Sequence, residues 1–143
     1  MTATADQAEG RTNPAARLGF QPGEVVQEIG YDDDCDLELR EAIEEITGQD
    51  LVDEEYDDVA DAVLLWFRDG DGDCTDALVD AIGLIEDGGA IWLFTPKAGR
   101  EGYVEPSEIS EAAQTAGLSQ TKSVSVAANW SAARMVTPRA ARR

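Results

Sequence analysis

One stretch, residues 58–99, constrains the fold more than any other part of the chain. Two apolar runs, Ala62–Phe67 and Ala90–Thr95, flank a segment whose apolar residues have helical spacing. This order predicts a strand, a crossover helix and a second strand, which together form a parallel pair. Parallel pairs belong to α/β sheets, which bind ligands at the carboxyl ends of their strands. We therefore expect an α/β fold with its candidate site at one edge of the sheet.

Further elements are expected on both sides of this pair. Asp36 is placed to cap a helix and Gly48 to end it, while Pro106 and Gly117 do the same for a later helix. The link at Ala128-Asn129-Trp130 is short, so the last two strands must be antiparallel. The expected strands are 24–29, 62–67, 90–95, 119–127 and 132–137, with an extended link at 51–52, and the expected helices are 37–47, 75–85 and 106–116.

The ends of the chain differ from its centre in composition. Residues 1–17 are small, polar and alanine-rich, so we expect a disordered or weakly ordered lead-in. Residues 18–138 should form a single α/β domain, and residues 139–143 a flexible basic tail. The start of the chain lacks the apolar centre of a signal peptide, and no segment is long and apolar enough to span a bilayer. These features predict a cytoplasmic protein.

The charge of the chain is strongly acidic and unevenly placed. It has 30 acidic and 11 basic residues and a net charge of −19, and from Glu24 to Asp87 only Arg40 and Arg68 are basic. Such a body should repel nucleic acid and anionic lipid, so we expect neither as a partner. Basic protein surfaces or cations suit it better. A highly soluble surface and adaptation to high salt explain the same composition, and composition does not separate these alternatives.

The chain lacks residues that several common kinds of catalytic centre require. The chain has no histidine, and its two cysteines, Cys35 and Cys74, do not form a CxxC pair. Zinc sites of the usual kinds, Cys–His dyads and histidine-activated serines are therefore excluded. We expect two free, buried or partly buried thiols in a reducing cytosol, with a disulfide between them as the alternative. Carboxylate pairs are too abundant to indicate a glycosidase.

Four blocks of the sequence together resemble a known family. They read VVQEIGYDDD, YDDVADAVLLWFRD, GGAIWLFTPKAGREGYVEPSEISEAAQTAGL and SVSVAANWSAARMV, and they are similar to the bacterial, mainly actinobacterial, DUF3052 proteins. The resemblance covers roughly Phe20–Pro138. It implies a small cytoplasmic protein with a reduced Rossmann-like, class I methyltransferase-like sheet, mostly parallel and ending in an antiparallel hairpin, with helices on both faces. It implies no activity and no catalytic residues.

The loop Gly30–Asp36 occupies the place of the glycine-rich loop in nucleotide-binding sheets. That loop works because glycines let backbone amides approach a phosphate at a helix N-terminus. Here only Gly30 is present, and four aspartates would each repel a pyrophosphate by about 3 kcal/mol at about 5 Å. We expect a loop that binds no cofactor. The candidates for a cofactor at this edge are Gly30, Tyr31, Asp32, Asp53, Lys97 and Arg100.

Asp69, Asp71 and Asp73 form a DxDxD run that resembles the start of a calcium loop. Such a loop needs glycine at position six and a bidentate glutamate at position twelve. The chain has Cys74 and Asp80 there, so the match is poor. We expect a solvated loop and a helix cap, and the three aspartates remain weak candidates for metal binding.

Three loops should meet at one rim because each follows a parallel strand. They are 32–36, 69–73 and 96–100, and the last carries Lys97 and Arg100. The rim is then either a crevice with an acidic and a basic side, or a surface where Lys97 and Arg100 neutralise nearby carboxylates.

The three tryptophans are expected to differ in exposure. Trp66 and Trp92 alternate within apolar strands and should lie in the core. Trp130 follows Asn129 at the hairpin turn, so it should be partly exposed and available to a partner. The expected partner surface consists of Asp33, Asp34, Trp130 and Arg134.

Two functions fit these observations. The first is a non-catalytic regulatory or protein-binding domain whose acidic surface binds a basic partner. The alternative is a methyltransferase-like enzyme or sensor that binds S-adenosylmethionine or another adenine ligand at the rim, because the cationic sulfonium is less excluded by the aspartates than a phosphate is.

Overall fold

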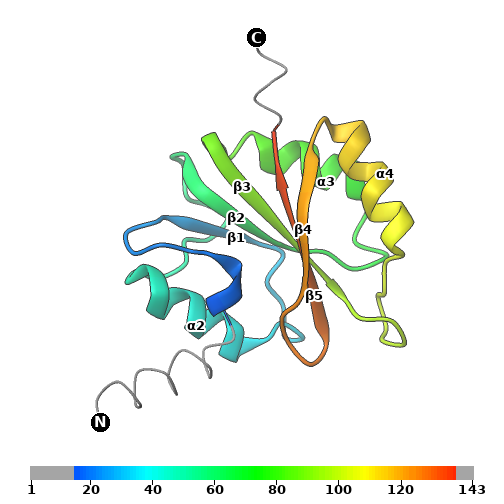
Figure 1. The fold of residues 1–143 in the computed structure, drawn as a ribbon, viewed down its shortest axis with the longest axis horizontal. Helices are drawn as coiled ribbons and strands as arrows, with labels where there is room; N and C mark the ends of the chain where they lie inside the picture. The colour runs from blue at the N-terminus through cyan, green and yellow to red at the C-terminus, as the bar shows by residue number, and fades with distance from the viewer. Residues whose placement is uncertain (1–14, 138–143) are drawn as a thin grey trace.

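A five-stranded sheet lies at the centre of the computed structural model, which describes residues 15–137 (Figure 1). The elements in chain order are η1 (Ala16–Leu18), β1 (Val26–Ile29), α2 (Leu37–Thr47), β2 (Ala60–Trp66), α3 (Cys74–Ile82), β3 (Ile85–Pro96), α4 (Pro106–Ala116), β4 (Ser119–Ser125) and β5 (Trp130–Val136).

The direction of the strands confirms the expected fold class. The strand order is β1-β2-β3-β5-β4. The first three strands pair in parallel, whereas β5 is antiparallel to both β3 and β4. Among the described strands, β5 alone therefore runs against the common direction. The sheet is mostly parallel and ends in the antiparallel hairpin that the short link predicted.

The helices begin and end largely where the sequence indicates. The Asp36 side chain accepts a hydrogen bond from the Leu39 amide at 2.8 Å, and Gly48 ends α2 at φ 79°. Pro106 begins α4, and Gly117 ends it at φ 86°.

The junction between α3 and β3 differs from the expectation. Helix α3 ends at Ile82 rather than at residue 85, and β3 begins at Ile85 rather than at residue 90. The reason is that Ile85, whose spacing fits the apolar face of the helix, instead pairs with Ala60 of β2. A residue that is apolar in either arrangement does not mark the boundary.

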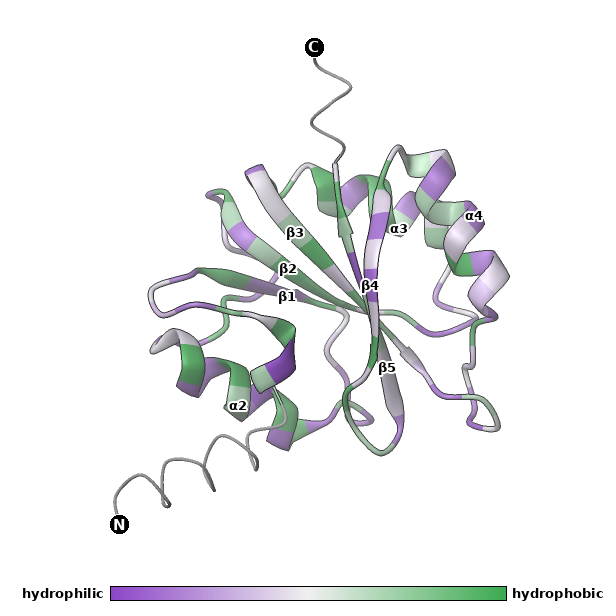
Figure 2. Ribbon diagram, viewed as in Figure 1, coloured by the Kyte–Doolittle hydropathy of each residue, from purple (hydrophilic) through white to green (hydrophobic). Residues whose placement is uncertain are grey.

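Two apolar layers, one on each face, hold the sheet. On one face Leu39 and Ile43 of α2 pack with Trp66 and Trp92, whereas α3 and α4 cover the other face. Figure 2 shows the hydrophobic residues gathered along the central strands. Both tryptophans are 1% exposed, which confirms that they lie in the core. A sheet covered on both faces explains the nearly continuous apolar runs of β2 and β3.

The outer edge of β1 is partly paired. The Glu28 amide donates to the Val52 carbonyl at 2.8 Å, and the Val52 amide donates to the Val26 carbonyl at 3.0 Å. The extended link expected at 51–52 is therefore a single parallel bridge between Val52 and Gln27. This bridge directs the next residues toward the carboxyl end of β1.

The domain boundaries are only partly within the described residues. Residues 1–14 and 138–143 lie outside them, and with them most of the expected lead-in and all of the expected tail. Residues 15–17 belong to the folded domain, because Ala15 is buried and Ala16–Leu18 form η1. Within residues 15–137 no helix has the length and apolar character needed to cross a membrane.

Candidate functional site

A cleft of about 410 Å³ lies at the carboxyl ends of β1, β2 and β3. We call it the acidic cleft, because five carboxylates and two guanidinium groups line it. The charged residues are Asp32, Asp34, Asp69, Asp71, Glu101, Arg68 and Arg100. The predicted meeting of the loops 32–36 and 69–73 at one rim is thus confirmed. Of the two basic residues expected from the third loop, only Arg100 lines this cleft.

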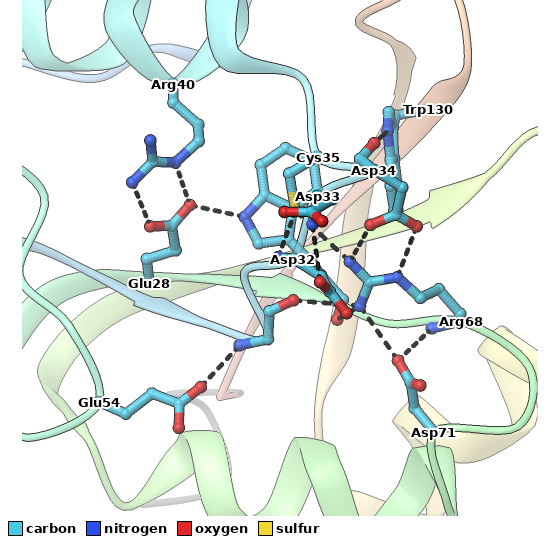
Figure 3. Close-up of polar contacts among 12 residues, drawn as sticks. Glu28, Asp32, Asp33, Asp34, Cys35, Arg40, Glu54, Arg68, Asp71 and Trp130 are labelled. Atoms are coloured by element: carbon cyan, nitrogen blue, oxygen red, sulfur yellow. Dashed lines mark hydrogen bonds and ion pairs between the residues drawn. The ribbon is translucent and has the colours of Figure 1, made fainter.

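Arg68 is the centre of the acidic cleft (Figure 3). Its Nε and one terminal nitrogen donate to the two carboxylate oxygens of Asp34 at 2.8 and 2.7 Å. The other terminal nitrogen donates, at 3.1 Å each, to the carbonyls of Gly30 and Trp66 and to the Asp71 carboxylate. Every nitrogen of the guanidinium group therefore has a partner within the chain.

The Asp34–Arg68 pair shifts the pKa of both groups so that each charged form is favoured. The hydrogen bond to Asp34 raises the pKa of Arg68, and the hydrogen bond from Arg68 lowers the pKa of Asp34. The Arg68 side chain is 15% exposed, and that of Asp34 is 53% exposed. The pair is a bidentate contact at the mouth of the cleft, and it fastens the loop after β1 to the end of β2.

Gly30 is where the first strand turns toward this arginine. Its φ is +84°, and a Cβ atom there would lie 2.5 Å from the Trp66 carbonyl oxygen, so only glycine fits. The Gly30 amide donates to the Glu54 carboxylate at 2.9 Å, and its carbonyl accepts from Arg68. Both backbone groups that a glycine-rich loop would offer to a ligand are bonded to side chains of the chain itself.

Three further amides of this loop are bonded internally. The Asp32 amide donates to Cys35 Sγ at 3.3 Å, and the Asp33 amide donates to the Asp32 carboxylate at 2.7 Å. The Cys35 amide donates to the Asp32 carbonyl at 3.1 Å. Tyr31 is 48% exposed, and its ring centre lies 4.4 Å from the Arg40 guanidinium carbon. The loop is a closed turn with its aspartates outward.

A buried carboxylate lies behind the loop. Glu28 is 6% exposed and accepts from Arg40 at 2.5 and 2.7 Å and from the Trp66 indole at 2.8 Å (Figure 3). The hydrogen bond to Glu28 raises the pKa of Arg40. A buried carboxylate needs such partners because its desolvation is costly. This network connects α2 to β1 and β2.

Trp130 corrects a sequence-based expectation. It is 3% exposed, not partly exposed, because its ring packs 4.8 Å from that of Trp66 and its indole nitrogen donates to the Asp34 carbonyl at 3.1 Å. Arg134 is not beside it: four residues along β5 correspond to about 13 Å. Its guanidinium instead donates to the Thr121 hydroxyl at 3.1 Å. Trp130 is therefore not available as part of an exposed contact surface, whereas Arg134 is only partly buried.

The remaining cofactor candidates do not form one group. Lys97 lines a different cleft, and Asp53 uses its carbonyl to accept from Gln27 at 3.0 Å. Neither Lys97 nor Arg100 takes part in the three ion pairs found among residues 15–137. Neither cation therefore forms an ion pair with a described residue, although Arg100 lines the acidic cleft together with its carboxylates. That they neutralise nearby carboxylates stays a prediction. Glu54, rather than Asp53, reaches back to Gly30.

The DxDxD run has ordinary structural partners. Asp73 caps α3 by accepting from the amides of Thr75 and Asp76, and Asp71 accepts from Arg68. Asp69 is exposed. In the described part of the chain, no three metal-ligating side chains lie close enough to hold an ion.

Both cysteines are free and buried, as expected. Burial raises the pKa of Cys35 and of Cys74 to about 11. Such thiols are almost fully protonated at neutral pH and are weak nucleophiles. The arrangement provides no activated thiol at the rim.

Sequence reasoning missed Arg68 and Glu54 as the residues that close the loop. A usable signal for Arg68 was present: Arg40 and Arg68 are the only basic residues between Glu24 and Asp87. These two arginines supply all three ion pairs of the described residues. Glu54 had no comparable signal, because it stands in a run of acidic residues.

Strand order and rim together define a domain with the class I methyltransferase-like fold. The model of a family described as "Protein of unknown function (DUF3052)" matches residues 15–139, and the chain belongs to this family. Relatives in Mycobacterium tuberculosis and Mycobacterium bovis, both described as uncharacterised proteins, are 52% identical over 132 residues. The match covers 92% of this chain and 83% of each relative.

Solved structures that are similar to this fold include methyltransferases. The pyocyanin biosynthetic protein PhzM matches with a TM-score of 0.61 and 14% identity over 88% of this chain and 54% of PhzM, so the chain spans about half its length. Magnesium protoporphyrin IX methyltransferase from Synechocystis, with bound SAM, has a TM-score of 0.55 and 11% identity, covering 94% and 81% of the two chains. A TehB-like SAM-dependent methyltransferase from Corynebacterium glutamicum has a TM-score of 0.51 and 12% identity, covering 96% and 100%. These likenesses show the fold.

Proposed function

We propose that the chain is a non-catalytic, regulatory protein-binding domain built on a methyltransferase-like sheet. The observation that carries the proposal is the closure of the loop after β1, where Glu54 and Arg68 occupy both backbone groups of Gly30. An adenine cofactor in such a sheet needs close approach to free backbone amides. To bind one at the Gly30 amide, the chain would have to break the hydrogen bond from that amide to Glu54.

The charge of the acidic cleft indicates the kind of partner. Five carboxylates line it, and of its two arginines only Arg100 has no ion-pair partner among the described residues. Beside the loop, Tyr31 and Leu37 are 48% and 54% exposed. Exposed apolar side chains surrounded by charge are typical of protein-binding surfaces. The partner is therefore a basic segment that places a cationic side chain in the cleft and an apolar one against Tyr31.

The same charge argues against the other large classes of partner. At a net charge of −19, nucleic acid and anionic membranes would be repelled at low salt. The two free thiols suit a reducing compartment, and a cytoplasmic location is part of the proposal.

Photocrosslinking tests the proposal with a matched control. Tyr31 and Val79 are exposed to nearly the same extent, 48% and 49%, and Val79 lies on α3, away from the acidic cleft. Each is replaced in turn by benzoylphenylalanine in the full chain, which is then irradiated in a lysate of the organism that encodes it. Mass spectrometry identifies the adducts.

The expected result is an adduct at position 31 with a protein that carries a basic segment, and little of it at position 79. Raising the salt to about 0.5 M should reduce the adduct, because charge attraction is screened. Equal adducts at both positions, or none at position 31, would contradict the proposal.

A second candidate, binding of S-adenosylmethionine or another adenine ligand, is favoured by one observation. Glu54 lies 24 residues after Gly30 and approaches it, near the position from which an acidic residue reaches the ribose in dinucleotide-binding folds. The Synechocystis neighbour with bound SAM has the same fold. Titration with S-adenosylhomocysteine separates the two candidates, because the protein-binding proposal predicts no binding.

A further inference from the structure

A second cleft lies on the other side of Pro96, between the first turn of α4 and the strands β4 and β5. We call it the lysine cleft. Its volume is about 290 Å³, and its apolar lining includes Val104, Ile109 and Ala133. It is independent of the closed loop, since Pro96 is the only described residue that lines both clefts.

The lysine cleft carries a positive charge, although the chain as a whole is strongly acidic. The chain has 30 acidic residues, yet none of the described residues that line this cleft is acidic. Lys97 is the one charged side chain among them, and it forms no ion pair with any residue of 15–137. An unpaired cation in a site without carboxylates favours an anionic ligand.

Hydroxyl groups from neighbouring strands line the same cleft. Thr95 of β3 stands opposite Ser131 of β5 in the sheet register, and Ser123 of β4 is nearby. Thr95 is 4% exposed as a whole residue, and it is one of the residues that line the cleft. These hydroxyls can donate and accept hydrogen bonds with polar atoms of a molecule in the cleft.

We infer that the lysine cleft binds a small carboxylic acid with an apolar body. The carboxylate would pair with Lys97, the hydroxyls would hydrogen-bond its polar atoms, and the apolar body would lie against Val104 and Ile109. One cation matches one negative charge, and a dianion is disfavoured by the net charge of −19. The volume is at the lower end of the range for ligand pockets and suits a molecule of roughly ten heavy atoms.

The test uses a carboxylic acid and its neutral amide as a matched pair. The full chain, labelled with ¹⁵N, is titrated with 3-phenylpropionate and with 3-phenylpropionamide, and amide shifts are followed by NMR. Lys97→Met and Lys122→Met are titrated in parallel. Lys97 and Lys122 are the only lysines of the chain, and Lys122 lies outside the cleft.

The expected result is a saturable shift at residues 95–104 and 131–133 with the acid, at an affinity on the order of 1 mM. The wild type should bind the amide about fivefold more weakly than the acid. Lys97→Met should likewise bind the acid about fivefold more weakly than the wild type does, whereas Lys122→Met should bind the acid as the wild type does. Equal affinity for acid and amide, an unchanged Lys97→Met, or no saturable shift would overturn the inference. The comparison of acid with amide on the wild type does not depend on any variant folding, and crosslinking at position 31 should be unchanged in Lys97→Met.

Discussion

The acidic cleft and the lysine cleft lie side by side at one edge of the sheet, and they use charge in opposite ways. In the acidic cleft, Arg68 is bonded at every guanidinium nitrogen to the chain itself. In the lysine cleft, Lys97 has no ion-pair partner among the described residues. A charged residue at a strand end can therefore either stabilise the fold or remain free to bind a ligand, and its position alone does not show which.

The same contrast explains why the usual ligand-binding loop of such a sheet is closed here. The Arg68 guanidinium donates to two backbone carbonyls and two carboxylates and so stabilises the loop after β1, and the groups it uses are lost to a ligand. The lysine cleft keeps its cation without an ion-pair partner among the described residues. Substitutions on the two sides should therefore affect different quantities, stability on one and binding on the other.

The largest expected effect is that of Gly30→Ala. The φ of +84° and the 2.5 Å approach to the Trp66 carbonyl should together destabilise the fold by about 3 to 4 kcal/mol, because backbone rather than a flexible side chain must move. Gly99→Ala is the control, since its φ is +87° but its Cβ would meet nothing within 4 Å, and it should cost about 1 kcal/mol. Urea unfolding measures both, and equal losses would show that Gly30 does not hold the loop closed.

Arg68→Met should have the next largest effect. It leaves the carbonyls of Gly30 and Trp66 without a donor, at about 1 kcal/mol each, and removes an ion pair worth up to about 1 kcal/mol because Asp34 is half exposed. Arg100→Met changes an arginine of the same cleft that forms no ion pair with a described residue, and it should stay within about 0.5 kcal/mol of the wild type. Urea unfolding measures both variants. A similar loss of unfolding free energy in both would show that Arg68 does not hold the loop closed.

The Asp34–Arg68 contribution should depend on pH. Because the pKa of Asp34 is lowered in the folded chain, its contribution is present above the unfolded pKa of about 3.9 and is lost as the pH falls through the lower folded value. The stability difference between wild type and Arg68→Met should thus shrink by up to about 1 kcal/mol between pH 7 and pH 3. A difference that stays constant over this range would mean that the ion pair contributes nothing.

The smallest expected effect lies at the opposite end of the sheet, where Glu86 forms no ion pair with any residue of 15–137. The pKa of Glu86 is raised by its hydrogen bond with Asp61 and by the charge of Asp61. A raised pKa means that stability from Glu86 is present below its unfolded pKa and is lost as the pH rises through the folded value. Glu86→Gln should therefore raise Tm slightly at pH 7 and not at pH 4 in thermal unfolding, and a lower Tm at pH 7 would contradict this.

Much of the fold could be predicted because the sequence marks its elements locally. Asp36 and Gly48, and Pro106 and Gly117, set the ends of two helices through capping, and the apolar runs set the central strands. The candidate site could be predicted less completely from the sequence. Trp130 and Glu54 are placed by contacts with residues far away in the sequence, Trp66 and Gly30, which no local pattern encodes. Charge alone also could not separate Arg68, which is fully bonded, from Lys97, which is not.

The most direct test of the closed loop is an NMR titration of the ¹⁵N-labelled full chain with S-adenosylhomocysteine. We predict no saturable shift of the Gly30, Tyr31 or Asp32 amides at millimolar ligand, because Glu54 and Arg68 occupy both backbone groups of Gly30. Saturable shifts at these amides would contradict this prediction, and would show that the loop after β1 is a cofactor site.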